Sequence, residues 1–228
     1  MLNNAGFVYY IVENNPIHPN TIIENKTMDR NGVSITHVSM AKGTTMSPER
    51  FNTIALYSVE KGKLDIEIRG EVRKSVVLEP GQFWLRAAHA LVGFEAVEDT
   101  VFTQVVLHRA SEISRSLLDH ETVVVKDLLD YGEKPQTMNL IRDKWMGLEL
   151  CSVAPGQNIR VDAEKNQIVV LGILDGNGGL TAGDRNMKIG KYQTFGIEAD
   201  HHVRLLCASG MKVLITRLIE QGNRKVTK

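Results

Sequence analysis

The chain has little cysteine, few aromatic residues and no long apolar run. Its two cysteines, Cys151 and Cys207, lie in separate apolar segments, which favours small buried residues over a disulfide framework; a bridge between them is the alternative. No stretch approaches the roughly eighteen apolar residues of a membrane-spanning helix. The start Met1-Leu-Asn-Asn lacks the basic and apolar regions of a signal peptide, so we expect a cytoplasmic protein.

The chain also lacks net charge. Its 27 Lys and Arg residues balance its 27 Asp and Glu residues, with seven His uncounted. Nucleic acids and anionic membranes are bound through basic surfaces, and no helix-turn-helix pattern is present, so we expect neither as a partner. No Ser-His-Asp or Cys-His spacing falls on one predicted pocket, which leaves nucleophilic catalysis without support.

An internal repeat of short strands and glycine turns organises the sequence. Residues 57–81 form an apolar strand, a glycine turn, a second strand and a third, and residues 171–190 repeat this pattern. Gly43 and Gly156 are 113 positions apart, and so are Gly70 and Gly183. A shared interval at two landmarks indicates a duplication, so we predict two domains within the 228 residues.

Strand periodicity dominates both halves. Residues 64–68 alternate apolar and acidic side chains, and residues 33–40 alternate in the same period, as expected of antiparallel sheets with one buried face. Apolar residues at roughly helical spacing between 110 and 131 predict a connector with a short helix and a strand. The predicted division is 1–109 for the first domain, with a leading strand at 7–12, 110–137 for the connector, 138–219 for the second domain and 220–228 for a tail.

Each half resembles a cupin, a small antiparallel jelly-roll β-barrel, from about residue 20 to residue 218. The resemblance rests on the glycine-punctuated strands, on the Pro80-Gly81 turn and on Ala88-His-Ala-Leu91, which is similar to a Pro-His-Ala-Leu form of the second cupin motif. It implies an all-β bicupin, with two tandem barrels joined by a short, partly helical connector. It also implies a homodimer, for which the edge of the leading strand 7–12 is a candidate surface.

In cupins that hold a metal ion, three His and one Glu bind it, and the first half departs from this pattern. Glu49 stands where the first ligand His is expected, and Val92 where the last is expected, with His89 three residues earlier. Glu49 and His89 are therefore candidates for ligand binding; the alternative for His89 is a loop cap in solvent. Arg86 and Arg204 fall near the pocket rim, where an Arg can receive a carboxylate or phosphate, unless both are simply solvated.

The second half keeps more donor atoms. Asp162 and Glu164 occupy the His-x-His positions, Gln167 lies close to the Glu position, and His201 follows Gly190 in the register of the second motif. Two carboxylates, an amide and an imidazole suit a divalent ion such as Mn²⁺, Mg²⁺, Fe²⁺, Zn²⁺ or Ni²⁺. The alternative is a solvated loop of charges.

These features predict a bicupin that binds a small molecule or a metal ion as a sensor or accessory protein. The second barrel is favoured for the site because it keeps the larger donor set, and the first barrel is expected to be structural. Two alternatives stay open: a metal-dependent enzyme of the isomerase or dioxygenase type, and a barrel pair that binds nothing.

Overall fold

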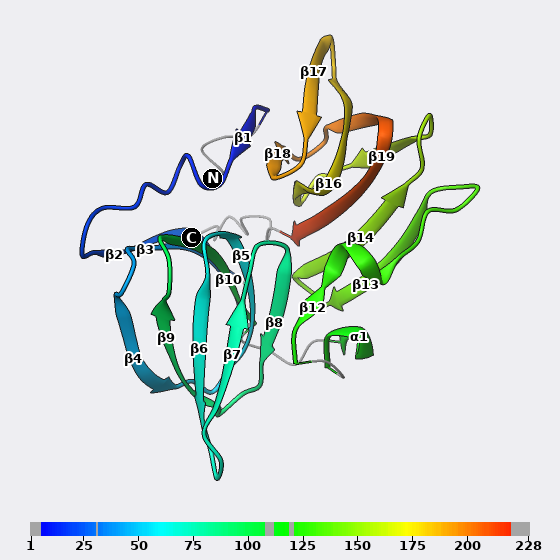
Figure 1. The fold of residues 1–228 in the computed structure, drawn as a ribbon. Helices are drawn as coiled ribbons and strands as arrows, with labels where there is room; N and C mark the ends of the chain where they lie inside the picture. The colour runs from blue at the N-terminus through cyan, green and yellow to red at the C-terminus, as the bar shows by residue number, and fades with distance from the viewer. Residues whose placement is uncertain (1–5, 31, 108–111, 119–120, 220–228) are drawn as a thin grey trace, which may run out of the picture. The chain divides into compact units, whose positions relative to one another are not determined.

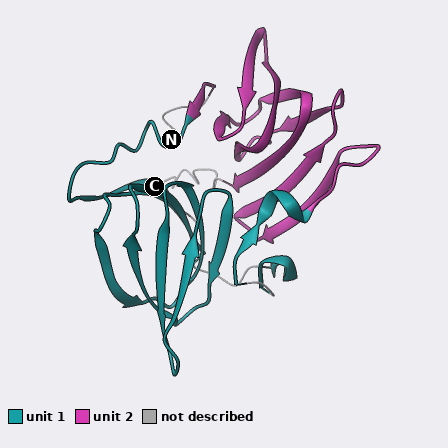
Figure 2. Cartoon of the chain, viewed as in Figure 1, with its two compact units in different colours: residues 1, 10–128 teal, residues 2–9, 129–228 magenta. Residues whose placement is uncertain are grey.

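The computed structural model describes residues 6–30, 32–107, 112–118 and 121–219, with the side chain of Arg30 excepted. The chain is built almost entirely of antiparallel strands, as predicted (Figure 1). It divides into two compact units, coloured separately in Figure 2. Of the described residues, unit 1 contains 10–107, 112–118 and 121–128, apart from position 31, and unit 2 contains 6–9 and 129–219.

Unit 1 consists of two sheets. One has the order β12-β8-β5-β10-β3-β2, and the other has the order β4-β9-β6-β7. The strands are β2 (Ile22–Arg30), β3 (Val33–Met40), β4 (Thr45–Arg50), β5 (Ile54–Lys61), β6 (Leu64–Arg69), β7 (Lys74–Leu78), β8 (Gln82–Arg86), β9 (Leu91–Ala96), β10 (Thr100–Leu107) and β12 (Val123–Val124).

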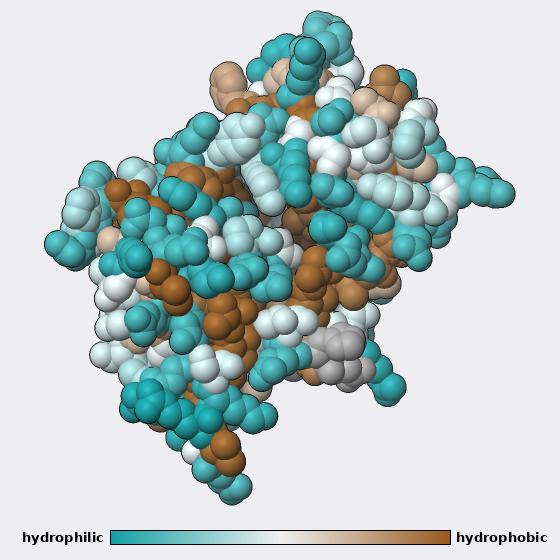
Figure 3. All heavy atoms as spheres, viewed as in Figure 1, coloured by the Kyte–Doolittle hydropathy of each residue, from teal (hydrophilic) through white to brown (hydrophobic). Residues whose placement is uncertain are grey.

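Alternation of side chains explains the core of unit 1. In β6, Leu64 and Ile66 are fully buried and join one apolar cluster with Leu78 and Phe102, whereas the intervening Asp65 keeps contact with solvent. On the face drawn in Figure 3, hydrophilic residues lie beside apolar ones over unit 1. The inward set of side chains therefore defines the interior in which the candidate site lies.

The described strands of unit 2 lie in one sheet, in which two strands are much longer than those of unit 1. It contains β13 (Gln136–Arg142), β14 (Met146–Val153), β15 (Asn158–Asp162), β16 (Gln167–Ala182), β17 (Arg185–Gly190), β18 (Gln193–Ile197) and β19 (His202–Ile219). The order is β18-β16-β19-β14-β13, with β15 paired to β19 and β17 paired to β16. The 16-residue β16 and the 18-residue β19 pair along their lengths, with register shifts that bend them.

Glycines hold the corresponding turns of the two units. Gly43 and Gly156 have φ angles of 78° and 79°, in the left-handed region that favours glycine. Gly43 donates its N–H to the carbonyl of Ala96, and Gly156 donates its N–H to the carbonyl of Cys207. The two positions 113 residues apart therefore fulfil the same role in the two halves.

The leading strand and the connector differ from the expected division. Strand β1 (Val8–Tyr10) pairs with β18, and residues 6–9 belong to unit 2, not to the first domain. The homodimer stays a prediction, but this strand already pairs within its own chain. The connector contains β11 (Glu112–Ile113), helix α1 (Arg115–Leu118) and a 3-10 helix, η1 (Val125–Leu128). The predicted tail, 220–228, lies outside the described residues.

Two further expectations can be compared with the structure. Cys151 and Cys207 are both buried free thiols, so the alternative of a disulfide between them does not hold. Over the described parts of the chain, no helix has the length and apolar character needed to cross a membrane.

Candidate ligand-binding site

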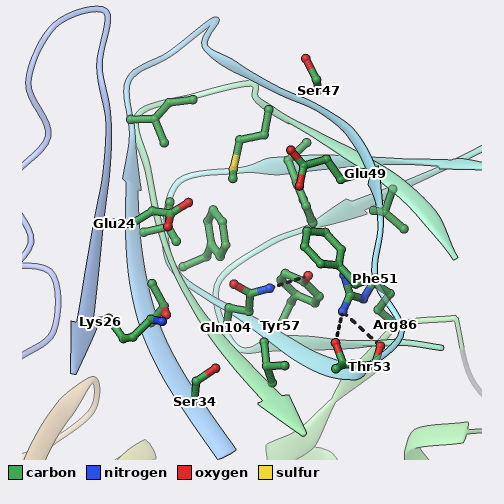
Figure 4. A pocket seen from close by; sticks show the side chains of 18 of the residues that line it. Glu24, Lys26, Ser34, Ser47, Glu49, Phe51, Thr53, Tyr57, Arg86 and Gln104 are labelled. Carbon is green, nitrogen blue, oxygen red and sulfur yellow. Dashed lines mark hydrogen bonds between the residues drawn. The ribbon is translucent and has the colours of Figure 1, made fainter. Parts of the chain in front are cut away.

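A cavity of about 700 Å³ lies inside unit 1 (Figure 4). Its apolar lining residues include Val38, Met46, Val92, Phe94, Phe102 and Val106. Its polar lining residues include Ser34, Thr36, Thr53, Tyr57, Arg86 and Gln104. The charged and exposed lining residues, which we call the mouth, are Glu24, Lys26, Asp29 and Glu49.

Arg86 is the buried cation of this cavity. It ends strand β8, where it pairs in register with Ala55 of β5, and only 1% of its surface is exposed. Its Nη2 donates to the carbonyl oxygen of Thr53 at 3.1 Å and to the Thr53 Oγ1 at 3.0 Å. Burial lowers the pKa of Arg86, but an Arg stays protonated in proteins, so the positive charge is retained inside the barrel.

Within the described residues, the Arg86 charge has no acidic partner. Nε and Nη1 have no hydrogen-bond partner in the described part of the chain, nor does any described carboxylate form an ion pair with this guanidinium. Burying an ion without a partner costs several kcal/mol in real proteins. Such a group is suited to receive an anion, because charge-assisted hydrogen bonds would offset that cost.

The loop between β4 and β5 encloses the Arg86 guanidinium. At one end of the loop, the Phe51 ring lies over the guanidinium, with the guanidinium carbon 4.5 Å from the ring centroid. At the other end, Thr53 accepts the two hydrogen bonds that Arg86 donates. His89 holds this loop: its backbone N–H donates to the Phe51 carbonyl at 2.7 Å, and its Nδ1 lies 3.1 Å from Asn52 Oδ1. Figure 4 shows Phe51, Thr53 and Arg86 gathered at one side of the cavity.

Tyr57 forms the aromatic wall next to Arg86. Its ring centroid lies 5.4 Å from that of Trp84, 5.1 Å from that of Phe94 and 6.2 Å from that of Phe102. The Tyr57 hydroxyl oxygen accepts a 2.9 Å hydrogen bond from Gln104 Nε2. Burial raises the Tyr57 pKa, although the nearby guanidinium and the Gln104 bond oppose that shift. The hydroxyl is therefore protonated at neutral pH and available as a donor to a ligand.

Strand registers show which residues of unit 2 stand at the positions of the cavity residues of unit 1. Arg86 pairs with Ala55 across β5 and β8, and the pair in the same place across β16 and β18 is Val169 with Ile197. Two positions earlier on the same strands, an aromatic residue stands in both units, Trp84 in the first and Phe195 in the second, which supports this correspondence. A charged position in the first barrel is thus apolar in the second.

The hydrogen-bonded pair beside Arg86 is replaced in the same way. Tyr57 faces Gln104 across β5 and β10, whereas Leu171 faces Ile215 across β16 and β19. Leu171 and Ile215 belong to one large apolar cluster that occupies the interior of unit 2. The polar cavity lies in the first barrel, whereas the sequence had favoured the second.

The structure separates the four candidate ligand-binding residues. Arg86 and Glu49 both line the cavity, one buried and one at the mouth. His89 does not line the cavity, but it fixes the loop that covers Arg86. Its positive φ of 65° lies in a short turn after β8. Arg204 lies on β19 of unit 2 with an exposed side chain, where the solvated alternative holds.

The predicted metal ligands of unit 2 do not form a metal site. Asp162 is 55% exposed and its carboxylate pairs with Arg160 at 2.7 Å. Glu164 is exposed, and its backbone N–H donates to the side-chain oxygen of Gln167 at 3.4 Å. His201 is also exposed, and its Nδ1 lies 2.8 Å from the Ala199 carbonyl oxygen. No group of three or more His, Cys, Asp or Glu suited to a metal ion occurs within the described ranges. The donor set therefore does not fit the proposed ion.

His37 takes part in a separate polar network outside the cavity lining. Its Nδ1 lies 3.0 Å from Thr103 Oγ1, which donates to Glu60 Oε1 at 2.9 Å. Burial lowers the pKa of His37 to about 4 and raises that of Glu60. Both shifts favour the uncharged forms, so His37 is a hydrogen-bonded structural residue.

Comparison with known proteins identifies the fold. No family model matches the chain, and no curated protein matches its sequence. Among solved structures, a cupin 2 conserved barrel domain protein from Leptotrichia buccalis superposes with a TM-score of 0.78 at 15% identity, covering 95% of this chain and 97% of its own.

Two enzymes of known structure are more distant. The salicylate 1,2-dioxygenase of Pseudaminobacter salicylatoxidans gives a TM-score of 0.59 at 10% identity, covering 82% of this chain and 70% of its own. A mutant of the oxalate decarboxylase of Bacillus subtilis gives 0.52 at 10% identity, covering 96% and 78%. At these identities the likeness establishes the fold, and the predicted all-β cupin architecture is confirmed.

Proposed function

We propose that this chain, which has the cupin fold in two tandem units, reversibly binds a small organic anion inside unit 1 as a sensor or accessory protein. The observation that carries the proposal is Arg86, a buried cation with free donors on Nε and Nη1. An anion seated there would supply the missing partner.

The size and lining of the cavity support a small-molecule ligand. Its volume of about 700 Å³ lies within the roughly 300–1,000 Å³ of typical ligand sites. Such sites combine apolar walls with a few convergent polar groups, and here the polar groups are Arg86, Tyr57 and Gln104. Unit 2, with its apolar interior, would act as the structural partner.

A metal-dependent reaction is not part of the proposal. The dioxygenase and decarboxylase activities belong to the two enzymes named above. In the described part of this chain, the residues that would have to bind a metal ion do not come together. Reversible binding requires only the groups that the cavity contains.

Ligand-induced stabilisation tests the proposal. Wild-type protein is heated in the presence of small carboxylates, and the shift in melting temperature is compared with that of Arg86→Met and of a matched control, Arg204→Met. We expect stabilisation of the wild type and of the control but not of Arg86→Met. Equal shifts in all three proteins would contradict an anion site at Arg86.

A further inference from the structure

The cavity of unit 1 contains one buried formal charge. Of its charged lining residues, Arg86 alone is buried, and the four residues of the mouth are exposed. The other polar lining groups near Arg86 are neutral, since they are the hydroxyls of Thr53 and Tyr57 and the amide of Gln104. The interior can therefore neutralise a single negative charge.

This charge count discriminates between anionic head groups. A carboxylate carries one negative charge and would be neutralised by the guanidinium. A phosphate monoester carries between about 1.5 and 2 negative charges at neutral pH, so part of its charge would stay unpaired in a poorly solvated interior. Arg86 on its own thus favours a carboxylate.

The mouth carries an acidic excess. Lys26 pairs with Asp29 at 2.9 Å, and within the described residues Glu24 and Glu49 form no ion pair. In Figure 4, Glu24 and Glu49 lie on opposite sides of the cavity. A second anionic group at the far end of a ligand would meet like charge there, whereas an uncharged or cationic group would not.

Part of the cavity lining is apolar. Met46, Phe94, Phe102 and Val106 line the cavity and would contact the body of a ligand. Burial of a hydrocarbon body on such a wall is favourable.

From these three features we infer that the ligand is a monocarboxylate with an apolar body and an uncharged or positively charged far end. Dicarboxylates and phosphate monoesters are selected against. The inference rests on the proposed function, because it assigns the ligand class of the same site.

Calorimetric titration at pH 8 with two matched series tests this assignment. The first series is hexanoate, hexanamide, 6-aminohexanoate, adipate and hexyl phosphate. The second is benzoate, benzamide, 4-(aminomethyl)benzoate, terephthalate and phenyl phosphate. We expect each monocarboxylate to bind at least about tenfold more tightly than its amide. It should bind about fivefold more tightly than the matching dicarboxylate, which is the size of a like-charge contact at an exposed mouth. It should also bind more tightly than the matching phosphate monoester, whose second charge would stay unpaired beside Arg86.

Variants of the mouth separate charge from shape. Glu24→Gln combined with Glu49→Gln is expected to raise the affinity for adipate and terephthalate about fivefold and leave hexanoate and benzoate unchanged. Glu71→Gln, an exposed residue outside the cavity lining, is the matched control and should change neither affinity.

The outcomes distinguish the two proposals. Dianions that bind the wild type as tightly as monocarboxylates, with binding lost in Arg86→Met, would overturn the ligand class and leave the anion site standing. If no carboxylate or phosphate in either series binds, the proposed function itself fails.

Discussion

Replacing Arg86 by Met should leave the unliganded protein nearly as stable as the wild type. Met has an unbranched, apolar side chain that can fill much of the space of the Arg stem. The substitution removes a buried charge whose desolvation, at several kcal/mol, is offset by no ion pair with the described carboxylates. Removing the charge therefore removes an unfavourable desolvation free energy that an ion pair would otherwise offset.

The losses work in the opposite direction. Two hydrogen bonds to Thr53 disappear, each worth about 1.5 kcal/mol or more because the donor is charged. The contact with the half-exposed Phe51 ring disappears too, at about 1 kcal/mol. Gains and losses nearly cancel, so we expect the free energy of unfolding to change by about 1 kcal/mol or less.

Urea denaturation of Arg86→Met, Arg86→Ala and the wild type measures this balance. The Ala variant removes the charge and also leaves a void, so it should be less stable than the Met variant by about 2 kcal/mol. A loss of 3 kcal/mol or more in Arg86→Met would refute the reasoning, because that is the range expected when a compensated buried charge pair is broken.

Three other variants test separate parts of the account. His89→Gly keeps the backbone bond to the Phe51 loop and suits the positive φ, so stability should change by about 1 kcal/mol or less while hexanoate affinity falls severalfold; unchanged affinity would contradict a positioning role. Ile197→Arg places an unpaired charge in the filled interior of unit 2 and should lower the free energy of unfolding, measured in urea, by about 3–5 kcal/mol; a neutral result would indicate space for a ligand there. The His37 pKa is about 4 in the folded protein, against an ordinary value of 6.5 for the unfolded chain, so the unfolded chain takes up a proton first and stability falls from pH 7 to pH 5 by about 2 kcal/mol through this residue. The raised pKa of Glu60 acts in the opposite direction in both proteins. Because His37→Asn lacks the titrating ring, its melting temperature should fall less between pH 7 and pH 5 than that of the wild type. Equal falls in the two melting temperatures would refute the assignment.

Local patterns in the sequence predicted the architecture well. The alternation of Leu64 and Ile66 with acidic residues corresponds to β6, and the glycines 43 and 156 occupy matching turns in the two units. The leading strand was assigned to the wrong half, because its pairing with β18 joins segments almost two hundred residues apart and local sequence carries no record of it.

The location of the site was harder to predict, because a motif register counts donor atoms and does not show which side chains fill an interior. Asp162 and His201 match motif positions, yet one pairs with Arg160 and both are exposed. Arg86 was predicted as a candidate for binding a carboxylate or phosphate, and it lines the cavity, although its burial and its unpaired donors depend on the loop at Thr53. One signal in the sequence could have located the site. Arg86 ends its strand with a charge, whereas the matching strand of the second repeat ends with the apolar Ile197.

A crystal structure of the protein soaked with 6-bromohexanoate tests the anion site most directly, because anomalous scattering from bromine locates the ligand independently of its fit to the density. The account predicts bromine inside unit 1, between the apolar wall and the mouth, with a carboxylate oxygen within about 3 Å of Nε or Nη1 of Arg86. Bromine bound elsewhere at full occupancy, with Arg86 left without an anion, would contradict it.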